Sequence, residues 1–148
     1  YLLVDGYNII HAWKGLRELA AKSMDAARER LIHRLANFQG WKKCRVIVVF
    51  DAYKVKGGVG SVEQKGGLWV VYTKEAETAD MYIEKTTYEL GRNNRVRVAT
   101  SDGLEQLIIL GRGAERMPAS ELEHEVLRAE EDIREVLSHP VTGNPGKK

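Results

Sequence analysis

Four short apolar runs alternate along the chain with segments whose apolar residues recur at helical spacing. The runs cover residues 1–4, 45–50, 68–72 and 95–100. Apolar runs of this length predict strands buried on both faces, which belong to parallel sheets. Strands that alternate with helices predict an α/β sandwich, here with a mainly parallel sheet of four or five strands flanked by helices.

Helix start and stop signals lie between these runs. They predict helices over about 23–38, 78–91 and 120–138, a turn or helical piece at 9–15, a short helix at 104–110 and a weak fifth strand at 114–117. Ser23 is expected to cap the first helix and Gly40 to end it. Ser120 and Glu123 form a capping box for the last one.

The size of the chain fits one domain. We expect residues 1–138 to fold together and residues 139–148, rich in Pro, Gly and Lys, to form a disordered tail. A hydrophobic content of 43%, a charged content of 30% and a net charge of +2 are ordinary for a globular protein. The single cysteine, Cys44, excludes a disulfide framework and a cysteine-based zinc site. Together with the lack of a membrane-length apolar run, this predicts a cytoplasmic protein, and the oligomeric state stays open.

Four aspartates follow the predicted strands. Asp5, Asp51 and Asp102 come directly after three of the runs, and Asp80 stands at a helix start. Each has a local explanation, such as an Asx-turn, a helix cap or a favourable interaction with the helix dipole. Parallel strands, however, deliver their carboxyl ends to one edge of the sheet, where ligands bind. We therefore expect the four carboxylates to converge there.

Carboxylates that lie close together repel each other, so we expect a cation to bind between them. Two of them about 4 Å apart repel by roughly 4 kcal/mol at an effective dielectric constant near 20. Oxygen ligands suit Mg²⁺ or Mn²⁺, and His11, the only histidine near the expected site, is interpreted as a surface residue. Such a metal can activate water and stabilise charge on a phosphate that the substrate brings. Oxygen ligands for a divalent metal, combined with a substrate that carries its own phosphate, predict phosphodiester hydrolysis.

A glycine-rich segment, residues 54–67, follows Asp51. It carries Lys54, Lys56 and Lys65 and predicts a flexible loop or a loose hairpin, but it does not match a P-loop. One interpretation is a solvated connection. The other is a basic flap that binds phosphates, with Arg112 and Arg116 as the alternative RNA track.

Four short motifs then resemble a known family. They are Val4-Asp5-Gly6-Tyr7-Asn8, Val48-Val49-Phe50-Asp51, Glu77-Thr78-Ala79-Asp80 and Ala99-Thr100-Ser101-Asp102. In this order they look like the motif series of NYN domains, a branch of the PIN-like nucleases. The similarity is greatest to the YacP-like bacterial subfamily, which includes a ribosome-associated endoribonuclease that cleaves mRNA in the A site.

The resemblance implies a PIN-like three-layer sandwich and a divalent-metal site for RNA cleavage. It implies metal-binding and catalytic roles for Asp5, Asp80 and Asp102, and a looser catalytic match for Asp51, whose side chain can simply hold its loop. Asn8 matches the family asparagine and is expected to orient Asp5 or a metal-bound water. Ser101 belongs to the last motif and is assigned to substrate binding. The implied partners are mRNA and the ribosome, with no membrane.

One position departs from the family pattern. Many PIN-like proteins carry a second acid two residues after the last aspartate, where this chain has Leu104. Glu105 is a candidate substitute, and weaker binding of a second metal is the alternative.

The leading hypothesis is thus a metal-dependent endoribonuclease. The second is a non-catalytic RNA- or ribosome-binding module that has kept the fold. A haloacid dehalogenase type phosphatase is disfavoured, because Tyr7 and Tyr53 stand where its second aspartate would be. A DNA flap nuclease stays open, since no residue identifies a 2′-hydroxyl.

Overall fold

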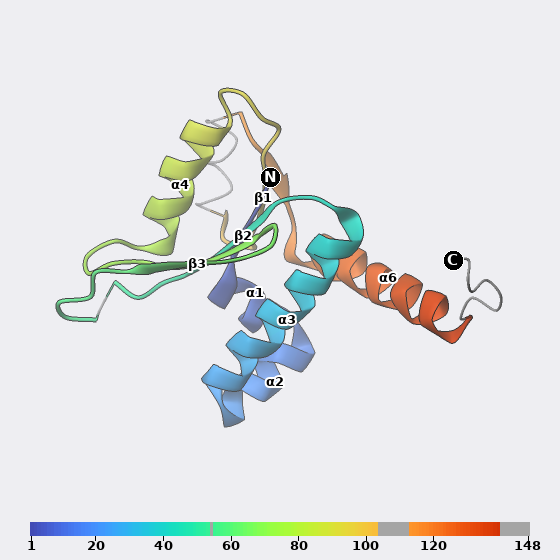
Figure 1. The fold of residues 1–148 in the computed structure, drawn as a ribbon. Coiled ribbons are helices and arrows are strands. Elements are labelled where there is room, and N and C mark those ends of the chain that lie inside the picture. The colour runs from blue at the N-terminus through green and yellow to red at the C-terminus, as the bar shows by residue number, and fades with distance from the viewer. Residues whose placement is uncertain (54, 104–112, 140–148) are drawn as a thin grey trace.

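The computed structural model describes residues 1–53, 55–103 and 113–139 and has three layers, with helices on both faces of one sheet (Figure 1). The strands are β1 (Leu2–Asp5), β2 (Val46–Phe50), β3 (Ser61–Lys65), β4 (Leu68–Tyr72), β5 (Arg97–Ala99) and β6 (Glu115–Met117). The helices are α1 (Gly6–Ala12), α2 (Lys14–Lys22), α3 (Met24–Lys42), α4 (Ala79–Leu90) and α6 (Ala119–Ser138). The predicted α/β sandwich is confirmed.

The sheet has six strands in the order β3-β4-β2-β1-β5-β6. All neighbours are parallel except β3, which runs antiparallel to β4 at one edge. The sequence predicted four or five strands. The additional one is β3, which lies in the glycine-rich segment 54–67 and pairs antiparallel with β4, so the hairpin is the one of the two interpretations of this segment that holds over 61–65. Its residues are all exposed, so pairing with β4 and not burial defines it.

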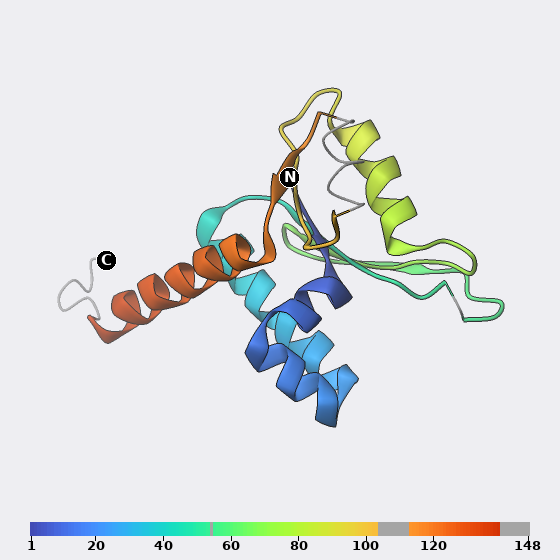
Figure 2. The same ribbon diagram turned by 180° about the vertical axis from the view of Figure 1, so that it is seen from behind.

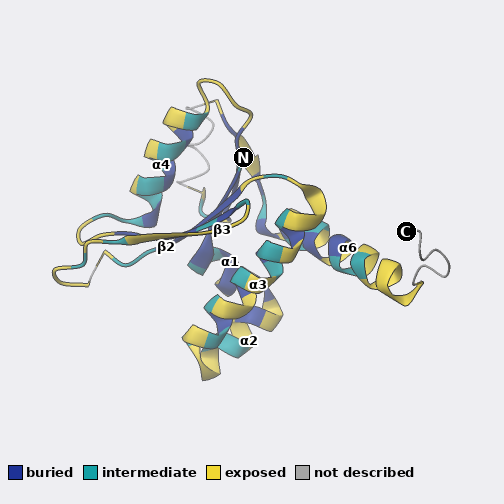
Figure 3. Ribbon diagram, in the orientation of Figure 1, coloured by how far each residue is buried: buried dark blue, intermediate teal, exposed yellow. Residues whose placement is uncertain are grey.

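The central strands β1, β2, β4 and β5 contribute to two hydrophobic cores, one on either face. Alternate residues such as Leu2, Val4 and Phe50 pack on the side of α1, α2, α3 and α6. The residues between them, such as Leu3 and Val49, pack with α4 on the other side. Figure 2 shows α4 apart from α1, α2, α3 and α6, and Figure 3 shows the central strands in the colour of buried residues and the edge strand β3 in that of exposed ones. Burial on both faces explains the unbroken apolar runs.

The helix boundaries differ in part from the predicted ones. Ser23 caps α3 as expected, its Oγ accepting a hydrogen bond from the Ala26 nitrogen at 3.1 Å. Gly40 does not end this helix, which continues to its left-handed C-cap, Lys43 (φ 55°). The capping box predicted for α6 is also wrong, because the helix already begins after Pro118 and no side chain caps it.

The remaining predictions about helices and the tail are confirmed in part. Helix α2 was not predicted, whereas α4 starts and ends as expected. The predicted helix at 104–110 and the predicted tail beyond residue 139 lie outside the described residues. In the described parts of the chain, no helix combines the length and apolar character that crossing a membrane requires.

Candidate metal and phosphodiester site

A cleft of about 750 Å³ opens at the carboxyl edge of the parallel strands. Its lining residues are Asp5, Tyr7, Asn8, His11, Met24, Asp51, Ala52, Tyr53, Val55, Thr78, Ala79, Asp80 and Asp102. All four predicted aspartates are among them, although they come from four separate segments of the chain. The parallel topology is the reason, because it places the ends of β1, β2 and β5 side by side.

Asp5 is the last residue of β1 and is only 9% exposed. Helix α1 begins at the next residue, but the Asp5 side chain does not cap it. The sharp change from strand to helix requires glycine at position 6, because an added Cβ would lie 2.4 Å from the Phe50 ring. The close approach of Gly6 to Phe50 thus brings the start of α1 against β2 and fixes the backbone beside Asp5.

Asp51 shapes the loop after β2. One of its carboxylate oxygens accepts a hydrogen bond from the Tyr53 nitrogen at 3.2 Å. The Ala52 nitrogen donates to the Thr73 hydroxyl at 2.8 Å, which joins this loop to the end of β4. Asp51 therefore has the loop-holding role that its looser motif match implied, and it also lines the cleft.

Asp80 enters the cleft from the first turn of α4. Thr78 caps this helix, and its Oγ1 accepts a hydrogen bond from the Met81 nitrogen at 3.1 Å. The remaining unpaired amides of the first turn favour a carboxylate at this position. The helix start therefore both positions and stabilises Asp80.

Asn8 connects the first motif with the last one. Its side-chain oxygen accepts hydrogen bonds from the Ser101 nitrogen at 2.7 Å and from the Ser101 hydroxyl at 3.0 Å. The Asp102 nitrogen donates to the hydroxyl of the fully buried Thr100 at 3.0 Å. These two contacts fix the segment that carries Asp102. Asn8 was expected to orient Asp5 or a metal-bound water, which stays a prediction, and its side-chain oxygen accepts both hydrogen bonds from Ser101.

The predicted basic residues are less concentrated at the cleft. Lys56 follows Val55, a cleft residue, and is exposed. Lys65 pairs with Leu68 at the amino end of β4, so it lies at the opposite edge of the sheet from the cleft. Arg116 is exposed on the edge strand β6 and does not line the cleft. Lys54, Leu104, Glu105 and Arg112 lie outside the described residues.

The donor set of the cleft fits a hard divalent cation in its chemistry. Carboxylate and amide oxygens are the ligands that Mg²⁺ and Mn²⁺ prefer. Among residues 1–53, 55–103 and 113–139, however, no three His, Cys, Asp or Glu side chains are already grouped closely enough to hold a metal ion. Mg²⁺ usually keeps several waters and binds through one or two carboxylates, so such a group is not required for it. Asp5, Asp80 and Asp102 are the residues that would hold it.

Several cleft residues were not assigned to the site from the sequence. Tyr7 and Tyr53 each stand two positions after an aspartate of the motifs, which is a usable signal. His11 was interpreted as a surface residue, and it is exposed but lines the cleft. Met24 and Val55 carry no local signal, because only the fold brings α3 and the loop after β2 to this place.

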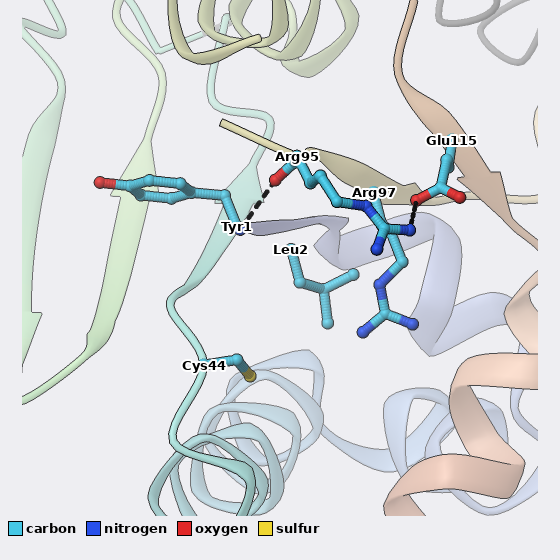
Figure 4. Close-up of a pocket in the computed structure, with 6 residues that line it drawn as sticks. All are labelled: Tyr1, Leu2, Cys44, Arg95, Arg97 and Glu115. Atoms are coloured by element: carbon cyan, nitrogen blue, oxygen red, sulfur yellow. Dashed lines mark hydrogen bonds and ion pairs between the residues drawn. The ribbon is translucent and has the colours of Figure 1, made fainter. Parts of the chain in front are cut away.

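A second, smaller cavity of about 350 Å³ lies at the amino edge of the sheet (Figure 4). Two arginines reach it, and each has an acidic partner: Arg95 pairs with Glu115 at 2.8 Å and Arg97 with Glu125 at 3.3 Å. Burial raises the pKa of the Cys44 thiol, although the positive charge of Arg97 acts in the opposite direction. The raised pKa favours the neutral form of the thiol. Because both arginines are paired with acidic side chains, this cavity is a weaker candidate for a functional site than the carboxylate cleft.

An α/β sandwich with a row of aspartates in a cleft at the carboxyl edge of its sheet is the architecture expected of the nuclease-type family that the motifs resemble. The chain matches the family model of the YacP-like NYN domain over residues 2–145, and it belongs to that family. The family expected from the four motifs is thus confirmed.

Known relatives agree with this assignment. The chain is 44% identical over 147 residues to the uncharacterized protein YacP of Bacillus subtilis (strain 168), covering 96% of this chain and 86% of the relative. It is also similar to the crystal structure of Rae1 (YacP) from Bacillus subtilis as a W164L mutant, with a TM-score of 0.81, 41% identity and coverage of 98% of this chain and 85% of the other. A second crystal structure of Rae1 (YacP) gives a TM-score of 0.79 at 45% identity, with coverage of 93% and 79%.

Proposed function

We propose that this protein is a divalent-metal-dependent endoribonuclease that hydrolyses RNA phosphodiester bonds, with mRNA on the ribosome as its substrate. The observation that carries the proposal is the convergence of Asp5, Asp51, Asp80 and Asp102 on one cleft. Membership of a nuclease-type family supports it. The proposal also implies a cytoplasmic location, since ribosomes and mRNA are found there.

The chain's own residues would divide the work. Asp5, Asp80 and Asp102 would hold Mg²⁺ or Mn²⁺, which when bound lowers the pKa of water and stabilises negative charge on the phosphate. Asp51 keeps the loop after β2 in place through its hydrogen bond to Tyr53. Asn8 keeps Ser101 in place and thereby the backbone that carries Asp102.

A non-catalytic RNA- or ribosome-binding module is the second candidate. It is favoured by one observation, namely that the described residues contain no ready group of three metal-ligating side chains. The two candidates differ in a simple way, because the module would bind RNA equally well after its cleft carboxylates are removed.

Cleavage of single-stranded RNA, measured with Mg²⁺, Mn²⁺ or EDTA, tests the proposal. We expect cleavage with either metal and none with EDTA. Asp5→Asn and Asp80→Asn should each abolish it, whereas Asp132→Asn, the same change at an exposed position on α6 outside the cleft, should not. If isolated RNA is inert, the assay is repeated with mRNA on ribosomes. Absence of metal-dependent cleavage in both settings would favour the binding module.

A further inference from the structure

The lining of the carboxylate cleft combines two kinds of side chain. The four aspartates and Asn8 are polar. Tyr7, Met24, Tyr53 and Val55, which we call the apolar set, add aromatic and aliphatic surface to the same cleft. A site that recognised only a phosphate and a metal would have no use for an apolar surface of this kind, because both of these ligands are charged and hydrated. The apolar set therefore points to an apolar part of the substrate.

Tyr7 is the member of the apolar set whose ring is held by neighbouring side chains. Its ring packs edge-on against Phe50 with centroids 5.2 Å apart, and Phe50 stacks on Tyr72 at 5.3 Å. Arg28 donates a hydrogen bond to the Tyr7 hydroxyl at 3.0 Å and also pairs with Asp25. This framework fixes the Tyr7 ring before any substrate arrives, which lowers the entropic cost of binding.

Tyr53 is the tyrosine of the apolar set that is exposed to solvent. Its backbone is fixed on both sides: the nitrogen donates to Asp51, and the carbonyl oxygen accepts from the Ala76 nitrogen at 3.0 Å. The residue is nevertheless 38% exposed although it lines the cleft. A firmly held backbone with an accessible ring is what a stacking platform requires.

We propose that Tyr53 stacks on a nucleobase next to the phosphodiester that faces the carboxylates, with Tyr7 as a second, fixed ring that lines the same cleft. This inference rests on the proposed nuclease function and specifies its substrate as a nucleic acid whose base at this position is unpaired. A base inside a duplex is stacked on its neighbours and has no face to offer Tyr53. Stacking on an aromatic ring tolerates any base, so the platform selects single-stranded structure and not sequence.

Binding without cleavage tests the stacking directly. Single-stranded RNA oligonucleotides with 2-aminopurine at successive positions are titrated with protein in EDTA. Stacking on Tyr53 should quench the fluorescence of 2-aminopurine at one position. Tyr53→Leu should abolish this quenching and weaken binding by ~5- to 150-fold, the range expected for one stacked base. Tyr53→Phe keeps the ring and should behave like the wild type.

Two controls keep the test specific. Tyr88→Leu makes the same change at a 54% exposed tyrosine on α4 outside the cleft and should leave binding unchanged. Wild-type protein is also titrated with RNA that carries an abasic nucleotide at the quenched position, which should lose affinity to the same extent as Tyr53→Leu. Equal affinity of Tyr53→Leu and wild type, or no penalty for the abasic RNA, would overturn the proposal.

These results are independent of cleavage. Quenching that depends on Tyr53 in a protein that does not cut RNA would contradict the nuclease function and support the platform. Intact cleavage by Tyr53→Leu, together with unchanged RNA affinity, would support the nuclease function and contradict the stacking platform.

Discussion

The side-chain oxygen of Asn8 accepts two hydrogen bonds from Ser101, one from its nitrogen at 2.7 Å and one from its hydroxyl at 3.0 Å. The two residues are 93 positions apart in the chain and follow the neighbouring parallel strands β1 and β5. Asp102 comes directly after Ser101, so its backbone position depends on this contact. A neutral amide thus joins two of the segments that carry the carboxylates.

This contact predicts an order among variants. Asn8→Ala removes the acceptor of both bonds and should lower the free energy of unfolding by about 1–2 kcal/mol, with a larger loss of RNA cleavage. Ser101→Ala removes only the hydroxyl bond and should cost less. Thermal melts and cleavage rates of the two variants and of the double variant form a cycle. The double variant should resemble Asn8→Ala, and fully additive losses would contradict the shared contact.

The carboxylate convergence could be predicted from the sequence because it follows from topology. Once residues 2–5 and 46–50 are interpreted as parallel strands, Asp5 and Asp51 must stand at one edge, and β1 and β2 do pair in parallel. Asp80 could be placed by the same logic, since α4 follows a parallel strand. No side-chain packing had to be known.

Elements defined by tertiary contacts could not be predicted in this way. Strand β3 has no buried residue and exists through its pairing with β4. Helix α2 is a different case, because Leu16, Leu19 and Ala20 follow helical spacing and pack on the core, but no side chain caps the helix to mark where it starts. The orientation of Tyr7 depends on Arg28, 21 residues further along the chain. For Tyr7 the deciding partner is distant in sequence, whereas β3 pairs with the next strand along the chain but carries no burial pattern that marks it as a strand.

Gly6 offers a prediction about packing. Gly6→Ala would place a Cβ 2.4 Å from the Phe50 ring, which is fully buried and cannot move away freely. The expected loss of stability is about 1–3 kcal/mol, typical of overpacking a core. Gly15→Ala is the matched control, because nothing lies within 4 Å of the added atom and alanine favours the α2 helix. Denaturant unfolding should show opposite signs for the two variants, and equal stabilities would contradict the close contact.

Cys44 offers a prediction about pH. Burial raises the pKa of this thiol, so at any given pH the folded protein holds less of the reactive thiolate than the unfolded chain. The stability that this gives is present below the ordinary thiol pKa and is lost as pH rises through the raised pKa. The pH profile of iodoacetamide alkylation should therefore have a higher midpoint in the folded protein than in urea. Coincident midpoints would show that the thiol is not shifted.

The proposed metal site predicts stabilisation by cations. Mg²⁺ or Mn²⁺ at about 100 times its dissociation constant should add about 2.7 kcal/mol to the free energy of unfolding. Asp5→Asn should reduce this gain, since it removes the most buried carboxylate of the cleft, whereas Asp132→Asn should keep it. Melting temperatures across a metal titration provide the measurement. An equal gain in the two variants would place the cation elsewhere.

A basic flap over the substrate was one of the two interpretations of the lysines after β2, and the structure places Lys56 and Lys65 far from each other. Lys56 lies beside the cleft residue Val55, whereas Lys65 lies at the far end of the β3–β4 hairpin. If RNA phosphates pass over the cleft, only a lysine near the cleft can neutralise one of them. The two residues therefore provide a test of position with a single type of substitution.

RNA affinity measured across a salt series should distinguish Lys56→Ala from Lys65→Ala. Each phosphate contact on single-stranded RNA contributes about 0.7 to the slope of log affinity against log salt. We expect Lys56→Ala to weaken binding at low salt and to reduce the slope by about that amount, because one counterion-releasing contact is lost. Lys65→Ala should change neither value, and both folds should persist because both side chains are exposed. A reduced slope in Lys65→Ala alone would move the RNA track to the outer edge of the hairpin, away from the carboxylates.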